Sequence, residues 1–312
     1  MKVSLLYNDR AGGGAPLARI RRAFDAHGHD LVRVITDRTD LERLVDPPVD
    51  LVVSAGGDGT ASNAARTVAG RAIPLAILPL GTANNIARSV GYVGSIETLI
   101  GGLRHDRRRL LDLGAICGPE VRRIFVESVG GGMVAAGIEA MRARRDGKVL
   151  ESAAARMELA LRGYYEIISQ LEPRPCTLLI DGTSLEGEFL LVEVLNTPWI
   201  GPNISLSPDA DPSDGMLSVV VAGDNERSAL QDYLERRILN GDDDVRVTLP
   251  TYQARRVSFQ GMHKLHVDDG VIDAPSGEPI AIQIEPAALE LLDPTPTIAR
   301  ASQTGEAHSS GI

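Results

Sequence analysis

The chain has 312 residues, enough for about two domains of ordinary size. Its 32 basic and 42 acidic side chains give a net charge of −10, and aromatic residues make up only 4%, which excludes a general nucleic-acid binder. Two cysteines are too few for a disulfide framework, the chain starts without a signal peptide, and no apolar run approaches the roughly 20 residues that span a bilayer. We expect a cytoplasmic protein without a membrane-spanning helix.

The first third of the chain alternates apolar runs with helical patterns. We expect helices at 17–26, 40–44 and 61–68, and strands at 3–7, 31–35, 51–53 and 75–78. These strands are apolar on both faces, which is typical of a parallel sheet covered on both sides. The sequence therefore predicts an open α/β domain.

Beyond about residue 111 the pattern changes to many short β-branched or alternating segments. One helix is expected at 151–171, and strands at 124–129, 177–180, 189–195, 217–221, 245–249, 257–260, 265–267 and 280–284. Turn pairs separate many of them: Asp181-Gly182, Asp214-Gly215, Asn240-Gly241 and Asp269-Gly270. We expect a β-sandwich at 113–286 after an α/β domain at 1–112, with 287–293 returning to the first domain and a disordered tail at 294–312.

The most informative motif is the glycine-rich turn 54–60, Ser-Ala-Gly-Gly-Asp-Gly-Thr, between a predicted strand and a helix. Glycines let the backbone approach a phosphate, and the helix N-terminus offers free N–H groups to an anion. The same turn is also compatible with a tight connection in which Asp58 only caps the helix. No Gly-Lys-Ser/Thr sequence is present, which excludes a P-loop.

Two further loops follow parallel strands and strengthen the phosphate interpretation. Residues 78–88, Leu-Pro-Leu-Gly-Thr-Ala-Asn-Asn-Ile-Ala-Arg, again place Gly, Thr and Asn before a helix, and residues 8–14 follow the first strand. Ligands of open α/β sheets bind at the carboxyl ends of the strands. We expect a nucleotide site built from these three loops.

These motifs resemble the diacylglycerol kinase catalytic family, which includes sphingosine, ceramide and bacterial lipid kinases. The resemblance rests on Gly56-Gly57-Asp58-Gly59-Thr60 followed by Pro79-Leu80-Gly81-Thr82-Ala83-Asn84, and it continues through Leu111-Asp112-Leu113-Gly114, Asn196, Ser207-Pro208-Asp209-Ala210, Asp214-Gly215-Met216-Leu217 and Val267-Asp268-Asp269-Gly270. It extends over about residues 2 to 292. It implies an α/β nucleotide domain of the NAD kinase and diacylglycerol kinase type followed by a β-sandwich.

The resemblance implies transfer of the γ-phosphoryl group of ATP to a lipid hydroxyl, most simply that of diacylglycerol to give phosphatidic acid, with Mg²⁺. The residues that it assigns to the nucleotide are Asn8, Asp9, Arg10, Ala11, Gly12, Thr36, Gly56, Gly57, Asp58, Gly59, Thr60, Ala61, Ser62, Asn63, Gly81, Thr82 and Asn84. Such catalysis depends on positioning and charge neutralisation. Asp58 and Asp112 are the expected carboxylates of the catalytic magnesium network.

A base and a structural metal site are also implied. The acceptor hydroxyl loses a proton, and Asp269 occupies the position of the family's base, with Asp268 as the weaker alternative; without the family, Asp269-Gly270 reads as a hairpin turn. Asp211, Asp214 and the carbonyl of Met216 suit a structural magnesium ion, although an acidic turn explains them as well.

Two positions depart from the family pattern. Asn85 replaces a frequent aspartate, and Val271 replaces the usual glutamate after Asp-Gly. Both weaken the expected carboxylate network. An NAD kinase-like enzyme and a catalytically impaired lipid- or nucleotide-binding regulator are the alternatives.

The expected partner is a membrane lipid substrate, not a nucleic acid. Two basic clusters, one at Arg104, Arg107, Arg108 and Arg109 and one at Arg142, Arg144, Arg145 and Lys148, are either solvated surface or a patch for anionic headgroups. The second interpretation predicts transient peripheral contact with the inner face of the membrane. A homodimer is compatible with the sequence.

Overall fold

The first half of the molecule is built on four parallel strands in the order β2-β1-β3-β4. The computed structural model describes residues 1–11, 15–117, 122–143, 152–241, 245–274 and 278–293. The strands of this half are β1 (Lys2–Tyr7), β2 (Asp30–Ile35), β3 (Leu51–Gly56) and β4 (Leu75–Pro79). Its helices are α1 (Leu17–Ala26), the 3₁₀ helix η1 (Arg38–Leu44), α2 (Asp58–Val68), α3 (Asn85–Ser89) and α4 (Ile96–Gly102). Every residue of β3 is buried, as expected for a strand covered on both faces.

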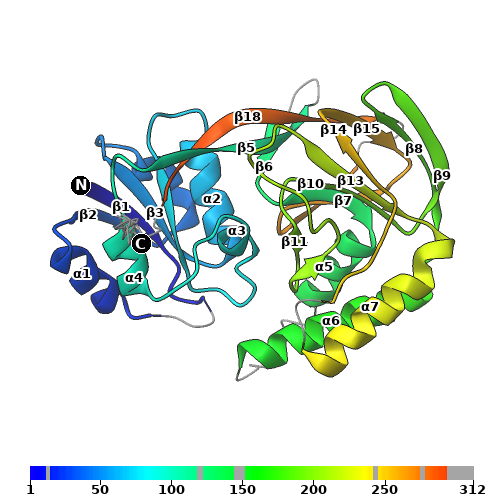
Figure 1. Ribbon diagram of the computed structural model, residues 1–312, viewed down its shortest axis with the longest axis horizontal. Coiled ribbons are helices and arrows are strands. Elements are labelled where there is room, and N and C mark those ends of the chain that lie inside the picture. The colour runs from blue at the N-terminus through cyan, green and yellow to red at the C-terminus, as the bar shows by residue number, and fades with distance from the viewer. Residues whose placement is uncertain (12–14, 118–121, 144–151, 242–244, 275–277, 294–312) are drawn as a thin grey trace, which may run out of the picture.

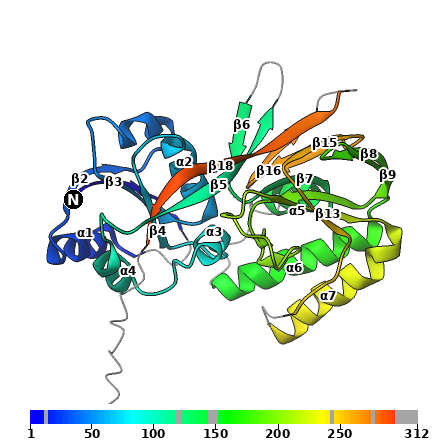
Figure 2. The same ribbon diagram turned by 45° about the horizontal axis from the view of Figure 1, so that its top comes forward.

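Two long antiparallel strands join this half to the second (Figures 1 and 2). They are β5 (Arg108–Cys117) and β18 (Ile280–Leu292). At one end β18 extends the parallel sheet, where Leu291 pairs with Leu75 of β4, and at the other end it belongs to the sandwich. The pairing shifts register between Glu285 and Leu289, where Ala287 has a φ of 54°. The same two strands therefore carry the chain through both halves.

The second half is a β-sandwich. One sheet continues β18 through β15 (Arg256–Gln260), β8 (Arg174–Ile180) and β9 (Thr183–Phe189), while β6 (Arg122–Phe125) pairs with β5. The other has the order β14-β13-β10-β7-β16-β17 and comprises β14 (Thr251–Ala254), β13 (Leu217–Ala222), β10 (Leu191–Leu195), β7 (Ser128–Gly132), β16 (Lys264–Val267) and β17 (Gly270–Asp273). Phe125, Val192, Val219 and Phe259 are buried together between the sheets. A short pair, β11 (Trp199–Ile200) and β12 (Ile204–Ser205), stands apart.

Three helices cover the outer face of the six-stranded sheet, where the sequence predicted only one (Figure 1). They are α5 (Met133–Ala143), α6 (Ala153–Gln170) and α7 (Arg227–Asn240), with a 3₁₀ turn η3 (Asp224–Glu226) before α7. The expected turn at Asn240-Gly241 is instead the end of α7, where Gly241 has a φ of 60°. The strand expected at 245–249 was wrong, because its described residues pair with no strand and Val247 and Leu249 pack into the helical layer. None of the described helices is long and apolar enough to cross a membrane.

Candidate active site

The carboxyl ends of the four parallel strands bring the predicted nucleotide loops to one edge. Gly56 of β3 pairs with Pro79 of β4, so the two glycine-bearing loops start side by side. The loop after β1 joins them, because the Asn8 N–H donates to the Ala55 carbonyl oxygen and the Asn8 side chain reaches the Thr60 hydroxyl at 3.5 Å. Thr36 follows β2 at the same edge and is exposed.

The two glycine loops touch through their backbones. A side chain on Gly81 would collide with the Cα atom of Gly57, and one on Gly57 would come within 3.2 Å of the Cα atom of Gly81. Asn84, whose φ is 53°, closes the second loop by accepting a hydrogen bond from the Gly81 N–H and donating to the Gly81 carbonyl oxygen. Gly81 is therefore required by this close approach, and the space beside Gly57 is tight for a side chain.

Asp58 ties the first loop to the second. Its Oδ1 atom accepts a hydrogen bond from the Ile86 N–H at 3.0 Å, across to the start of α3. Burial raises the pKa of Asp58, and the backbone N–H groups of residues 84–86 oppose that shift. This carboxyl therefore holds the two loops together as well as lying in the first turn of α2.

Asp269 faces the same turn from the sandwich. Its Oδ2 atom lies 2.6 Å from the point where a Cβ atom on Gly59 would stand. The side chain is exposed and makes no hydrogen bond within the described part of the chain. A carboxylate of the second half thus lies against the N-terminal turn of α2 in the first half.

Asp268, the weaker alternative for the base, is fully engaged. Its Oδ2 atom forms an ion pair with Arg66 of α2 at 2.6 Å, and its Oδ1 atom accepts hydrogen bonds from the Val126 and Glu127 N–H groups. Only 1% of its side chain is exposed. These contacts split the single strand expected at 124–129 into β6 and β7, because the amides between the two strands bind Asp268. Its role is to fix the turn that presents Asp269.

Four guanidinium groups from four elements surround this turn. Arg66 pairs with Asp268, Arg142 of α5 donates to the Asp269 carbonyl oxygen at 2.7 Å, and Arg123 of β6 and Arg38 of η1 lie near Gly270 and Gly59. Arg38 and Arg123 form no ion pair with any described residue. A protein of net charge −10 therefore concentrates positive charge beside Asp269.

Glu127 is a functional candidate that the sequence analysis missed. It is 6% exposed, and its Oε1 atom has no hydrogen-bond partner among the described residues. Burial above all, and then the charges of Asp58 and Asp268, raise the pKa of Glu127 well above its usual range, while a hydrogen bond from Asn85 opposes the shift. Asn85 itself is buried and donates to the Gly201 carbonyl oxygen. Position 85 carries an asparagine where the family often has a carboxylate, and the acidic side chain of Glu127 lies beside it.

The Asp112 carboxylate is already used by the backbone. Oδ1 accepts a hydrogen bond from the Ala287 N–H at 2.8 Å and Oδ2 accepts one from the Gly215 N–H at 2.7 Å. This buried carboxylate connects β5 to the register shift of β18 and to the acidic turn. The contacts account for Asp112 structurally, and its place in the magnesium network stays a prediction.

The residues of the predicted structural metal site form a turn that is closed by hydrogen bonds among its own residues. Asp211 accepts hydrogen bonds from the Ser213 N–H and hydroxyl, and Asp214 accepts one from the Met216 N–H. Such bonds are typical of turns closed by Asp side chains. Across the described ranges, no group of three His, Cys, Asp or Glu side chains is arranged to hold a metal ion. A magnesium ion would need main-chain oxygens or water here.

The remaining predicted nucleotide residues lie in the loop after β1, in the loop after β4 and in α2. Asp9, Arg10 and Ala11 lie in the loop after β1, Gly12 lies outside the described residues, and Thr82 accepts a hydrogen bond from Arg156 of α6. Ala61 and Ser62, in the first half of α2, are buried. The Asn63 side chain is bound by Arg66.

The expected basic clusters do not form one free surface. Arg108 is paired with Glu290 at 2.6 Å, and the Nε atom of Arg109 is buried. Arg142 is turned to Asp269, whereas Arg144, Arg145 and Lys148 lie outside the described residues, as does the tail 294–312. Trp199 packs under the Arg88 guanidinium, 4.8 Å from the ring centroid.

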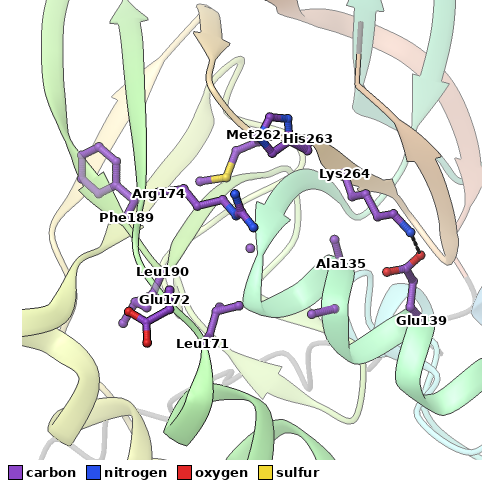
Figure 3. A pocket seen from close by; sticks show the side chains of 12 residues that line it. Ala135, Glu139, Leu171, Glu172, Arg174, Phe189, Leu190, Met262, His263 and Lys264 are labelled. Carbon is purple, nitrogen blue, oxygen red and sulfur yellow. Dashed lines mark hydrogen bonds and ion pairs between the residues drawn. The ribbon is translucent and has the colours of Figure 1, made fainter. Parts of the chain in front are cut away.

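A pocket of about 270 Å³ opens beside α5 in the sandwich half (Figure 3). Its walls are mostly apolar and include Ala135, Leu171, Phe189 and Met262, and the Lys264–Glu139 ion pair lies at its edge. The same helix continues to Arg142 and the same strand, β16, continues to the Asp268 turn. The pocket thus shares two elements with the candidate active site.

Comparison with known proteins identifies this arrangement. Residues 2–116 match the diacylglycerol kinase catalytic domain, and residues 132–293 match the YegS C-terminal NAD kinase beta sandwich-like domain. A diacylglycerol kinase of Mycobacterium tuberculosis is 29% identical over 303 residues, which cover 94% of this chain and 95% of the relative.

Two solved structures share the fold. A putative diacylglycerol kinase from Bacillus anthracis has a TM-score of 0.71 at 20% identity, covering 93% of this chain and 96% of its own. An NAD kinase from Archaeoglobus fulgidus in complex with ATP has a TM-score of 0.50 at 12% identity, covering 94% of each chain. The architecture is thus that of the two-domain α/β and β-sandwich kinases. The chain belongs to the diacylglycerol kinase catalytic family, in its form with a YegS-type C-terminal domain.

Proposed function

We propose that the protein transfers the γ-phosphoryl group of ATP to the hydroxyl of a membrane lipid, with diacylglycerol as the acceptor. One observation carries this proposal: Oδ2 of Asp269 lies against Gly59, at the turn where α2 begins. Phosphate groups bind readily at such glycine-bearing helix N-termini. An acceptor hydroxyl bound beside this contact would have the Asp269 carboxylate within reach and the phosphate to be transferred at the start of α2.

The proposed step is an in-line displacement. The acceptor oxygen forms a bond to the γ-phosphorus, the bond from that phosphorus to the β–γ bridging oxygen breaks, and ADP leaves. The acceptor proton passes to the Asp269 carboxylate. The guanidinium groups of Arg38, Arg123 and Arg142 lie close enough to the turn to offset the negative charge of the phosphates.

The carboxyl groups at the edge fit a magnesium ion that accompanies ATP. Mg²⁺ prefers one or two carboxylates together with water and phosphate oxygens, so it does not need a ready-made cage. Asp58 and the orphaned Oε1 atom of Glu127 would hold it. When bound, the ion supplies positive charge to the β- and γ-phosphates.

The pocket beside α5 is the proposed site of an acyl chain. Its apolar walls suit hydrocarbon, and its volume of about 270 Å³ is at the small end for ligand pockets, which suits part of a chain and not a whole lipid. A lipid held there would bring the enzyme to the membrane surface.

The test is a product assay with purified protein, labelled ATP and Mg²⁺. Mixed micelles would present diacylglycerol, ceramide, a sphingoid base or phosphatidylinositol, with free NAD as a separate acceptor. Labelled phosphatidic acid is the expected product. Label in another lipid would correct the acceptor, label in NAD alone would establish the NAD kinase alternative, and ATP binding without any product would establish a regulator.

A further inference from the structure

A buried Glu–His pair lies on the helix-covered face of the six-stranded sheet, outside all the residues discussed above. Glu193 of β10 and His266 of β16 stand on either side of Gly130 of β7, and both are paired with it in register. A side chain on Gly130 would collide with the Glu193 carboxyl. Because this glycine has none, the two side chains meet across β7, with Oε1 of Glu193 2.7 Å from Nε2 of His266.

Both ring nitrogens of His266 face oxygen acceptors. Nδ1 lies 3.0 Å from the Asp268 carbonyl oxygen, and Nε2 faces the Glu193 carboxyl. A carbonyl oxygen cannot donate, so Nδ1 carries a proton whatever the state of the other nitrogen. The pKa of His266 supports this arrangement: burial, the largest single effect, lowers it, but the charge and hydrogen bond of Glu193 together with those of Asp268 raise it overall.

The bond from His266 ends on the turn that presents Asp269. Asp268 has a φ of 50°, an uncommon backbone conformation for a residue with a side chain. Such a conformation persists only where surrounding contacts determine it. Besides His266, those contacts include the Arg66 ion pair, the amides of Val126 and Glu127, and the hydrogen bond from the Asp268 N–H to the Ser128 carbonyl oxygen. His266 contacts the backbone carbonyl oxygen of Asp268 itself, whereas Arg142 contacts that of Asp269 from outside the sheet.

We propose that the Glu193–His266 pair is a positioning device for the proposed base: Glu193 orients the His266 ring, and its Nδ1–H holds the Asp268 carbonyl oxygen so that the Asp269 carboxylate faces Gly59. Neither residue touches the reacting groups. The inference deepens the proposed function and rests on it only where turnover is measured.

The first experiment examines the intact protein without substrate. Protein labelled with ¹⁵N in its six histidines is studied by NMR near pH 8, and the His266 signals are assigned by their loss in His266→Asn. At this pH an ordinary histidine, with a pKa of about 6.5, is neutral and carries one ring proton. We expect the His266 ring to carry a proton on Nδ1 in its neutral form as well as in its charged form. A bare Nδ1 overturns the proposal, and this result does not depend on what the enzyme phosphorylates.

The second experiment compares two substitutions that place an amide differently. In a Glu193→Gln background no buried charge is left unpaired. There, His266→Asn keeps a donor near the Nδ1 position, whereas His266→Gln places its amide near Nε2 and leaves the Asp268 carbonyl oxygen without its donor. We expect kcat within about threefold of the parent for the asparagine variant and a loss of about tenfold or more for the glutamine variant, with the KM for ATP unchanged in both.

Val194→Ala is the matched control for general destabilisation. Val194 is the fully buried neighbour of Glu193 on the opposite face of β10, where it packs into the core between the two sheets. We expect it to lower the melting temperature and leave kcat within about twofold. Equal kcat in the two His266 variants overturns the proposal, and if either variant fails to fold, the NMR result decides. A parent enzyme that phosphorylates no lipid contradicts the proposed function instead.

Discussion

The Oδ2 atom of Asp269 lies where a side chain on Gly59 would begin, 2.6 Å from the position of its Cβ atom. Gly59→Ala should therefore displace Asp269 and lower kcat by about tenfold or more, since small misplacements of reacting groups carry such penalties. Alanine also favours the helix by about 0.5–1 kcal/mol over glycine, so the melting temperature should stay the same or rise. Turnover by product assay and melting by calorimetry give the two readouts. An unchanged kcat would contradict the placement.

Asp269→Asn removes the proposed proton acceptor while keeping the size of the side chain. We expect kcat to fall by about 10²–10⁴-fold, the range for loss of general base catalysis, with ATP affinity retained. Equilibrium binding of a labelled nucleotide separates the two effects. The matched control is Asp273→Asn, an exposed aspartate at the far end of β17, which should act like the parent. Near-normal turnover of Asp269→Asn would contradict the assignment of Asp269 as the proton acceptor.

Arg66→Met leaves the Asp268 carboxylate buried without its cation. Because breaking such a pair costs more than the pair contributes, we expect the free energy of unfolding to fall by about 2–4 kcal/mol. Urea denaturation measures the loss. Arg162→Met, which removes an exposed ion pair with Glu158, should cost at most about 0.5 kcal/mol. Similar losses in the two variants would show that the partly buried Arg66–Asp268 pair contributes no more to stability than an exposed ion pair.

Glu127→Gln tests the carboxyl that lies beside Asn85. We expect the Mg²⁺ concentration for half-maximal activity to rise by about tenfold, because loss of a carboxylate weakens the hold on the ion. Initial rates over a Mg²⁺ series at fixed ATP provide the measurement. Glu235→Gln, an exposed change on α7, serves as the control. An unchanged Mg²⁺ dependence would leave Glu127 a structural residue.

His266 gives the protein a pH-dependent contribution to stability. Glu193 and Asp268 face the ring, Tyr164 of α6 lies near both Glu193 and Glu127, and the pKa of His266 is raised on folding. A raised histidine pKa contributes stability that is complete below the unfolded value of about 6.5 and is lost as the pH rises through the folded value. In urea titrations, the stability advantage of the parent over Glu193→Gln/His266→Asn should shrink as the pH rises above the unfolded value of about 6.5. A constant or growing advantage would contradict this sign.

Local patterns were sufficient for much of the fold. Strands buried on both faces and the loops that follow them predicted the parallel sheet, and α6 was found from its spacing. The helix α7 was missed because its sequence is mostly polar, although Leu230, Tyr233, Leu234 and Arg237 repeat at helical spacing on its buried side. The helix α5 was missed because it follows a run of three glycines and is rich in alanine. Only packing on the sheet distinguishes such segments from loops.

The candidate site was predictable where one short stretch of chain carries it. The loops around Gly57 and Gly81 are visible in the sequence because glycine and asparagine mark their unusual backbone. Glu127, Arg66 and His266 were not, because each acts through a partner far away in the chain. An isolated glutamate or histidine in a strand gives no local signal of what it will face.

The long strand β18 also has a consequence for how the chain is synthesised. β4 gains its outer neighbour only when Leu291 arrives to pair with Leu75. On the ribosome, the α/β half therefore keeps an open sheet edge at β4 until nearly the whole sandwich has been synthesised. The two halves have separate architectures, yet β18 belongs to the sheets of both, so neither half expressed alone would have a complete sheet.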